Sequence, residues 1–258
     1  MNPFRISETQ QSSAAELAEL IESSGSVVAL TGAGISVPSG IPDFRTPGTG
    51  LWAKVDPMAV ATIDAFHRDT KRFWDFYRPR FHDLADKEPN PAHAALAELE
   101  RRGQLDAVIT QNIDRLHRMA GSEEVIEVHG SIATASCTSC AATYPLERVE
   151  SLFDEEGIAT CIDCTGKVKP DVVLFGELLP TEAMVRAEEL CFGADLLLCV
   201  GSSLEVHPVA GLPGLTVGHG GRIAIITKSS TPYDRDAVVR MNGDVADDLQ
   251  AVLTALDG

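Results

Sequence analysis

Four cysteines form the clearest chemical pattern in this 258-residue sequence. Cys137 and Cys140 stand in CTSC, and Cys161 and Cys164 stand in CIDC after twenty intervening residues. Two turns that each present a pair of thiolates suit a tetrahedral zinc ion, and four thiolates leave no coordination position for water. Disulfides and unrelated core cysteines are the alternatives. The N-terminal sequence has no export signal, which disfavours disulfides, so we expect one structural zinc ion.

The stretch TGAGISVPSGIPDFRTPGTGLW at residues 31–52 begins like the phosphate-binding turn of a dehydrogenase. Gly32 and Gly34 follow an apolar run and provide the tight turn and close backbone approach that a pyrophosphate requires. The third glycine of the pattern is absent, because Val37 stands there and Pro38 follows it. An ordinary glycine-rich turn explains GAG alone as well as a nucleotide site does. The residues after it indicate a loop that can fold over a ligand and exclude water.

Three further polar turns also follow apolar runs. QNID at 111–114 contains Asn112 and Asp114, HG begins at His129, and GSS occupies 201–203. A neutral imidazole suits the removal of a hydroxyl proton near pH 7, and a glycine turn with two hydroxyls suits phosphate or ribose oxygens. Taken singly, these residues also fit a core histidine, a helix cap and plain turns.

Short apolar runs alternate with helical patterns along most of the chain. The runs are VVAL at 27–30, DAVIT at 106–110, EVIEV at 124–128, VVLF at 172–175, DLLLCV at 195–200 and IAIIT at 223–227. We interpret them as buried parallel strands, with helices after Pro91, after Pro180 and at the C-terminus. This alternation predicts a doubly wound α/β sheet whose ligand lies at the carboxyl ends of the strands.

Two stretches interrupt the alternation, and we expect them to form a smaller lobe. They are a helical insertion at 36–90 and the cysteine-bearing segment at 132–169. The remaining segments, 1–35, 91–131 and 170–258, would form the Rossmann-like lobe of a single catalytic domain spanning 1–258.

Composition excludes several classes of protein. A formal charge of -17 and a pI near 4.7 argue against sequence-independent nucleic-acid binding and favour basic partners. Mean hydropathy is +0.02, and no apolar run approaches the roughly 20 residues that span a bilayer. We therefore expect no membrane insertion and a cytoplasmic location.

Taken in order, the motifs resemble those of the sirtuin family, the NAD-dependent protein lysine deacylases, over nearly the whole chain. They are GAGISVPSGIPDFR at 32–45, TQNIDRLH at 110–117, HG at 129–130, both CxxC pairs, KPDVVLFGE at 169–177, GSSLEVHP at 201–208 and NGDVADDL at 242–249. The resemblance implies a Rossmann-like sheet with a smaller lobe made of a helical insertion and a zinc-ribbon module. It also implies that NAD is a co-substrate: nicotinamide is released, and the acyl group passes from lysine to ADP-ribose.

The resemblance also implies a role for each matching residue. His129 resembles the catalytic base, and Asn112 and Asp114 resemble the residues that order the nicotinamide ribose and receive the carboxamide. Cofactor contacts fall on Gly32, Ala33, Gly34, Val37, Phe44, Arg45, Gln111, Asn112, Ile113, Asp114, Gly201, Ser202, Ser203, Thr227, Lys228 and Val245. The acyl-lysine peptide would lie between Val173, Phe175, Gly176 and Glu177 on one side and Val206 on the other. Thr227 and Lys228 depart from the pattern, since the family usually has asparagine there.

Tyr77 and Arg80 bear on which acyl group is removed. Their Y-x-x-R spacing resembles that of sirtuins that hold the distal carboxylate of succinyl or malonyl lysine. Val37 and the intervening Pro79 favour the other interpretation, a core tyrosine and a surface arginine. We therefore expect deacetylation, with desuccinylation or demalonylation and mono-ADP-ribosyl transfer as the alternatives. A dehydrogenase would require the full glycine fingerprint and an acidic residue after the second strand. A zinc-bearing binding module with a degenerate nucleotide site would not explain the presence of His129, Asn112 and Asp114 together.

Overall fold

The computed structural model describes residues 8–43, 50 and 55–258, and six parallel strands form its main sheet. The strands are β1 (Val27–Thr31), β2 (Ala107–Thr110), β3 (Val125–Glu127), β7 (Leu196–Val200), β8 (Arg222–Ile226) and β9 (Ala237–Met241). Their spatial order is β3-β2-β1-β7-β8-β9, with parallel pairing throughout. The chain therefore winds outward in one direction from β1 and in the other from β7. Ligands of such sheets bind where the direction reverses, at the carboxyl ends of these two strands.

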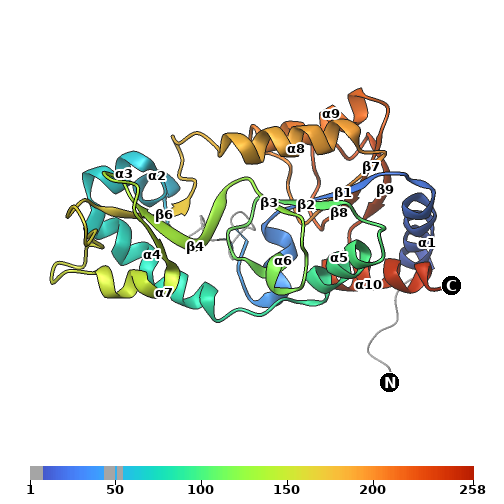
Figure 1. Cartoon of the computed structure of the whole chain (residues 1–258). Helices are drawn as coiled ribbons and strands as arrows, with labels where there is room; N and C mark the ends of the chain where they lie inside the picture. The colour runs from blue at the N-terminus through green and yellow to red at the C-terminus, as the bar shows by residue number, and fades with distance from the viewer. Residues whose placement is uncertain (1–7, 44–49, 51–54) are drawn as a thin grey trace, which may run out of the picture.

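Helices cover both faces of the sheet, which explains why β1 and β7 are buried along their whole length (Figure 1). On one face lie α1 (Glu8–Ser23), α5 (Pro91–Arg101) and α10 (Val245–Leu256), which share one apolar core cluster. On the other face lie α8 (Thr181–Gly193) and α9 (Leu212–Gly218), in a second cluster. The doubly wound α/β architecture expected from the sequence is confirmed.

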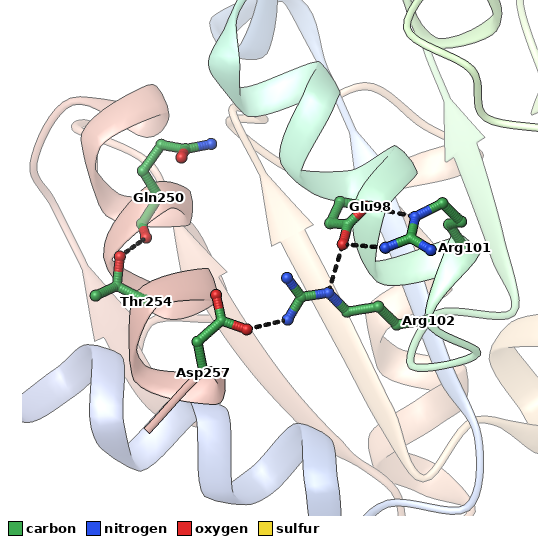
Figure 2. Close-up of polar contacts among 6 residues, drawn as sticks. All are labelled: Glu98, Arg101, Arg102, Gln250, Thr254 and Asp257. Atoms are coloured by element: carbon green, nitrogen blue, oxygen red, sulfur yellow. Dashed lines mark hydrogen bonds and ion pairs between the residues drawn. The ribbon is translucent and has the colours of Figure 1, made fainter.

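An ion-pair network joins the C-terminal ends of α5 and α10 (Figure 2). Arg102 Nε lies 2.7 Å from Glu98 Oε1, and Arg102 Nη1 lies 2.7 Å from Asp257 Oδ1. Arg101 adds a second guanidinium to Glu98. Because these groups are exposed, the network aligns the two helix ends but contributes little to the free energy of unfolding.

The smaller lobe combines a three-stranded antiparallel sheet with short helices. Its elements are α2 (Pro57–Val60), α3 (Ile63–Arg68), α4 (Thr70–Ala85), β4 (Gly130–Cys137), β5 (Thr143–Pro145), α7 (Leu146–Val149) and β6 (Val168–Val172). Phe66, Phe73 and Trp74 are buried in a third core cluster, which also contains Ile132 of β4. Trp74 Nε1 donates to the Val168 carbonyl of β6 at 3.3 Å. The helical insertion and the cysteine-bearing segment therefore share one core.

One strand prediction was wrong. We expected VVLF at 172–175 to be a parallel strand of the main sheet, but β6 ends at Val172 and pairs antiparallel with β4. A short apolar run does not specify which sheet a strand joins. The small sheet reaches from Gly130 to Val172, slightly beyond the 132–169 segment expected from the sequence. The sequence analysis also did not identify α1 and β9.

Short elements complete the chain. They are the α-helical turn α6 (Leu116–Met119) and the 3-10 turns η1 (Ala33–Ser39), η3 (Glu150–Leu152) and η4 (Val209–Gly211). Of these, η1 and α6 follow β1 and β2 and lie beside the candidate site.

Candidate active site

The glycine loops that follow β1 and β7 touch each other through their backbones. Gly32 N–H donates to the Val200 carbonyl at 3.1 Å, and Gly34 N–H donates to the Gly201 carbonyl at 2.8 Å. A Cβ at Gly34 would lie 2.7 Å from the Gly201 oxygen, and Gly201 has a φ of 62°. Only glycines permit this approach. The two loops therefore pack backbone against backbone at the switch point, where ligands of such sheets bind.

Ser202 and Gln111 link the loops after β7 and β2. Ser202 is buried, and its hydroxyl accepts from Gln111 Nε2 at 2.9 Å and from Leu204 N–H at 3.2 Å. The expected cofactor residues Gly201, Ser202 and Gln111 therefore lie together. Ser203 follows them in the same turn.

Asn112 and Asp114 lie in a buried polar cluster centred on the Ser36 hydroxyl. Ser36 Oγ donates to Asp114 Oδ2 at 2.6 Å and accepts from Asn112 Nδ2 at 3.0 Å. Asn112 Nδ2 also reaches the Gly32 carbonyl at 3.2 Å, and Asp114 Oδ1 accepts from Leu116 N–H at 3.0 Å. Burial raises the pKa of Asp114, while the bond from Ser36 opposes that shift. Both expected residues are thus fixed in orientation by the loop after β1.

Ser36 itself was missed by the sequence analysis. It lies within GAGIS, between the expected residues Gly34 and Val37, and is 1% exposed. The available signal was a hydroxyl inside a glycine-rich turn. Only the fold reveals that the 3-10 turn η1 points this hydroxyl at Asp114. Val37, in contrast, is 42% exposed.

His129 follows β3 and is half-buried, with Nδ1 3.0 Å from the Gln111 carbonyl oxygen. A carbonyl can only accept, so the ring proton lies on Nδ1 and the lone pair is on Nε2. Burial lowers the pKa of His129, and the bond to Gln111 partly opposes that shift. The imidazole is therefore neutral near pH 7 and presents Nε2 as a base.

The segment after β6 is tied to His129 and to the helical insertion. Val173 N–H donates to the His129 carbonyl at 2.8 Å, and Phe175 N–H donates to the Ala61 carbonyl at 2.9 Å. The Phe175 side chain is 47% exposed. Gly176 has a φ of 91°, which accommodates the sharp turn that follows. Val206, expected on the opposite side of the peptide, is half-buried in the loop after β7.

Glu177 is engaged within its own loop. Its Oε2 accepts from Leu174 N–H at 2.8 Å and from Lys169 Nζ at 3.1 Å, and both charged side chains are largely buried. Lys169 also donates to the Val172 carbonyl at 2.8 Å. The pair fixes the shape of the 173–177 loop.

Three further expected cofactor residues, Thr227, Lys228 and Val245, lie after β8 and β9. Thr227 is buried and donates its N–H to the Met241 carbonyl at 3.0 Å, while exposed Lys228 pairs with Asp244 at 2.9 Å. Val245 begins α10 and is buried. Ile113 contacts the small-lobe core, and Ala33 begins η1. Phe44 and Arg45 lie outside the described residues.

The four cysteines lie close enough together to bind one metal ion. All four sulfur atoms lie within 4.8 Å of one another, with Cys137 and Cys164 at 3.4 Å and Cys140 and Cys161 at 3.6 Å. Four sulfurs around zinc at about 2.3 Å are separated by about 3.8 Å, so the geometry fits a tetrahedral zinc site. Tyr144 OH lies 3.0 Å from the Cys161 sulfur and suits a supporting hydrogen bond.

The Tyr77 and Arg80 side chains are both engaged by neighbouring aromatic residues of α4. The Tyr77 ring packs on Phe73, with centroids 4.5 Å apart, and burial raises the pKa of its hydroxyl. The Arg80 guanidinium lies over the Phe76 ring, 3.5 Å from its centroid, and donates to the Phe76 carbonyl. Pro79 is accommodated inside α4.

Comparison with known families connects this geometry to one of them. A family model described as the Sir2 family matches residues 32–208, which include the glycine loops, His129 and all four clustered cysteines. The chain belongs to the Sir2 family. The resemblance inferred from its motifs is confirmed.

Individual Sir2 relatives match the chain over most of its length. An NAD-dependent protein deacetylase of Sulfurisphaera tokodaii is 46% identical over 227 residues, covering 87% of this chain and 89% of the relative. An NAD-dependent protein deacetylase of Thermotoga maritima is 41% identical over 238 residues, covering 92% of this chain and 96% of the relative. A solved structure of Sir2 bound to acetylated peptide has a TM-score of 0.85 at 39% identity and covers 93% of this chain and 96% of that chain. A Sir2 complex with a p53 peptide and NAD+ has the same TM-score and coverage at 40% identity.

The described part of this Sir2 chain has no helix with the length and apolar character needed to cross a membrane.

Proposed function

We propose that the protein is an NAD-dependent protein lysine deacetylase that releases nicotinamide and O-acetyl-ADP-ribose. The observation that carries this proposal is the neutral His129, whose Nε2 is basic. Its Nδ1 contacts the carbonyl of Gln111, which directly precedes Asn112 and Asp114 in the chain. Membership of the Sir2 family supports the same activity. Acyl-lysine proteins or peptides are the substrates.

When bound, NAD supplies an activated ribose carbon that accepts the acyl oxygen. The glycine loops, Ser202 and Gln111 would hold phosphate and ribose oxygens, because they combine backbone free of side chains with hydroxyl and amide groups at the switch point. Asn112 and Asp114 would orient the nicotinamide end. His129 Nε2 would take the proton of a ribose hydroxyl. By resemblance, Phe44 would shield the reacting carbon and Arg45 would meet phosphate.

The peptide would enter as an extended chain beside the 173–177 loop, which His129 and Ala61 already hold through backbone bonds. Backbone pairing gives affinity with little demand on peptide sequence. Val173, Phe175 and Gly176 would lie along one side and Val206 along the other. Glu177 would act through the shape of the loop.

We assign one structural zinc ion to Cys137, Cys140, Cys161 and Cys164, since four thiolates leave no open position. The zinc module and the 36–90 insertion form the small lobe of a single catalytic domain, and the rest of 1–258 forms the Rossmann-like lobe. We assign the protein to the cytoplasm, where thiolates stay reduced.

The test is to incubate the protein with NAD and an acetyl-lysine peptide and to analyse the products by mass spectrometry. The expected products are the deacetylated peptide, nicotinamide and O-acetyl-ADP-ribose. ADP-ribose attached to protein without peptide deacetylation would identify a mono-ADP-ribosyltransferase instead. Nicotinamide release with no change in the peptide would contradict the deacetylase assignment.

A further inference from the structure

Asp248 is a fully buried acidic residue that has no part in the reaction proposed above. It lies in the first turn of α10, and its exposed fraction is 0%. A buried carboxylate is tolerated only where hydrogen-bond donors replace the water that it has lost. The donors that contact Asp248 therefore indicate what this side chain holds in place.

Each oxygen of the Asp248 carboxylate accepts a hydrogen bond. Oδ2 accepts from the Gly243 backbone N–H at 3.0 Å, and Oδ1 accepts from Nε2 of Gln10 in α1. Burial raises the pKa of Asp248, and these two bonds oppose that shift. The carboxylate therefore joins the loop that precedes α10 to the N-terminal helix.

The contact leaves no room for a side chain at Gly243. A Cβ there would lie 2.6 Å from Asp248 Oδ1 and 2.9 Å from Gln10 Nε2. Both distances are well below ordinary van der Waals contact. The loop backbone therefore packs directly on the buried carboxylate and its amide partner.

The loop that Asp248 contacts also contains an expected cofactor residue. It comprises residues 242–245 and follows the carboxyl end of β9, the side of the sheet on which such ligands bind. Val245 is one of the cofactor residues that the family resemblance implies. Asp244 Oδ2 accepts from Nζ of another of them, Lys228, at 2.9 Å. The loop is therefore tied to Lys228 through Asp244 and to α1 and α10 through Asp248.

The position of β9 in the sheet indicates which end of NAD meets this loop. His129 follows β3 at one edge of the main sheet, and the 242–245 loop follows β9 at the opposite edge. The glycine loops after β1 and β7 lie between the two. With the nicotinamide end at His129 and the pyrophosphate at the glycine loops, the adenosine end reaches β8 and β9.

We propose that Asp248 is a positioning residue of the NAD site, which accepts from Gly243 and so holds the 242–245 loop in place beside the adenosine end of NAD. This inference rests on the proposed function, because it assigns the loop to NAD. A side chain that served only to join α10 to α1 would not need to accept from the loop backbone.

Exchanging donor and acceptor between two residues tests this role. Asp248→Asn keeps the size of the side chain, but its amide has only one oxygen, so either Gly243 or Gln10 is left with its N–H facing another N–H. Adding Gln10→Glu to the same chain restores both bonds. The introduced amide can then donate to the introduced carboxylate while its oxygen accepts from Gly243.

We expect Asp248→Asn to raise the dissociation constant for NAD about tenfold, the scale of one unsatisfied buried hydrogen bond. The double variant should return to within about threefold of wild type. Gly243→Ala displaces the loop from the other side of the same contact and should weaken NAD binding to a similar extent. Calorimetry with NAD and with ADP-ribose should give the same ranking, whereas KM for the acetyl peptide should stay within about twofold.

Asp247→Asn and Leu249→Val are the matched controls. Asp247 is exposed in the same turn of α10, so its substitution gives the same loss of charge. It should leave both dissociation constants within about twofold of wild type. Leu249 is buried in the apolar core. Its substitution should lower the midpoint of thermal unfolding without changing NAD binding below that midpoint.

The inference is overturned if folded Asp248→Asn or Gly243→Ala binds NAD as tightly as wild type, or if the double variant binds no better than Asp248→Asn. It is also overturned if KM for the peptide rises as much as the dissociation constant for NAD. If the wild type binds NAD but does not deacetylate, the proposed function fails, and the ranking of dissociation constants still decides the role of Asp248. A wild type that does not bind NAD would refute both.

Discussion

His129 shows how one backbone contact sets the chemistry of a side chain. The Gln111 carbonyl holds the ring proton on Nδ1, so Nε2 is the basic atom. We expect His129→Ala to reduce the deacetylation rate at least about a hundredfold, the usual scale for a general base. NAD binding, measured by calorimetry, should be largely retained. An equal loss of NAD affinity would make His129 a binding residue.

The same residue predicts the pH dependence of the reaction. Burial lowers the pKa of His129, so its inactive protonated form accumulates only below the ordinary histidine value of about 6.5. The profile of kcat/KM should therefore lose activity on the acid side below about pH 6.5. A profile measured from pH 5 to 8 with an acid limb centred above that value would disagree.

Arg80 determines the prediction for acyl selectivity. Its guanidinium is engaged by the Phe76 ring and carbonyl, so we expect it to contribute nothing to recognition of a distal carboxylate. Acetyl peptide should have a higher kcat/KM than the succinyl version of the same peptide. Arg80→Met should leave this ratio within about twofold, since no charge-assisted bond is lost. If the protein prefers the succinyl peptide and Arg80→Met abolishes that preference, Tyr77 and Arg80 bind the distal carboxylate and this prediction is wrong.

At the scale of elements, the 173–177 loop depends on one largely buried ion pair. Glu177→Gln keeps an oxygen for the Leu174 N–H but removes the charge that faces Lys169. We expect KM for the peptide to rise about two- to fivefold, the scale of a single ion pair, with KM for NAD unchanged. Glu188→Gln, on the exposed side of α8, is the control. A larger increase in KM for NAD than in KM for the peptide would show that this loop serves the cofactor rather than the peptide.

The cysteine-bearing segment should owe its folding to metal. The core formed with the helical insertion contains Cys137, Cys161 and the buried Trp74. Cys137→Ala or chelation should lower the midpoint of thermal unfolding by about 10 °C, because binding of structural zinc contributes folding free energy.

Trp74 fluorescence can follow this transition in a Trp52→Phe background, since the chain has only two tryptophans. Metal analysis should give one zinc ion per chain. A demonstrably metal-free protein with unchanged unfolding and activity would contradict the structural assignment.

At the scale of the whole molecule, the formal charge of -17 should affect how strongly the protein attracts charged peptide substrates. A negative field attracts basic peptides, and salt screens it over about 8 Å at 0.15 M and about 3 Å at 1 M. The peptide KM should therefore rise with NaCl when lysine or arginine flanks the acetyl-lysine. The same peptide with neutral flanks is the control. Equal salt dependence of both peptides would show that the net charge does not select substrates.

Local sequence was sufficient for much of the fold. Five of the six parallel strands and three long helices were predicted, because burial between two helical layers requires continuous apolar runs and helices require their own period. The cysteine tetrad was predicted for a similar reason, since each CxxC turn is a local structure. Gly32, Gly34 and Gly201 were predicted to form tight turns, and the structure shows that their close approach is possible only without side chains.

Only the tertiary structure decided what depends on residues distant in sequence. Val172 joined a different sheet from the one expected, since an apolar run does not choose its partner strand. The Arg80 side chain turned to Phe76. Ser36 meets Asp114 and His93 across 78 and 57 positions of the chain. These contacts have no local period or motif, because they arise only when β1, β2 and α5 pack together and their polar groups must find partners away from water.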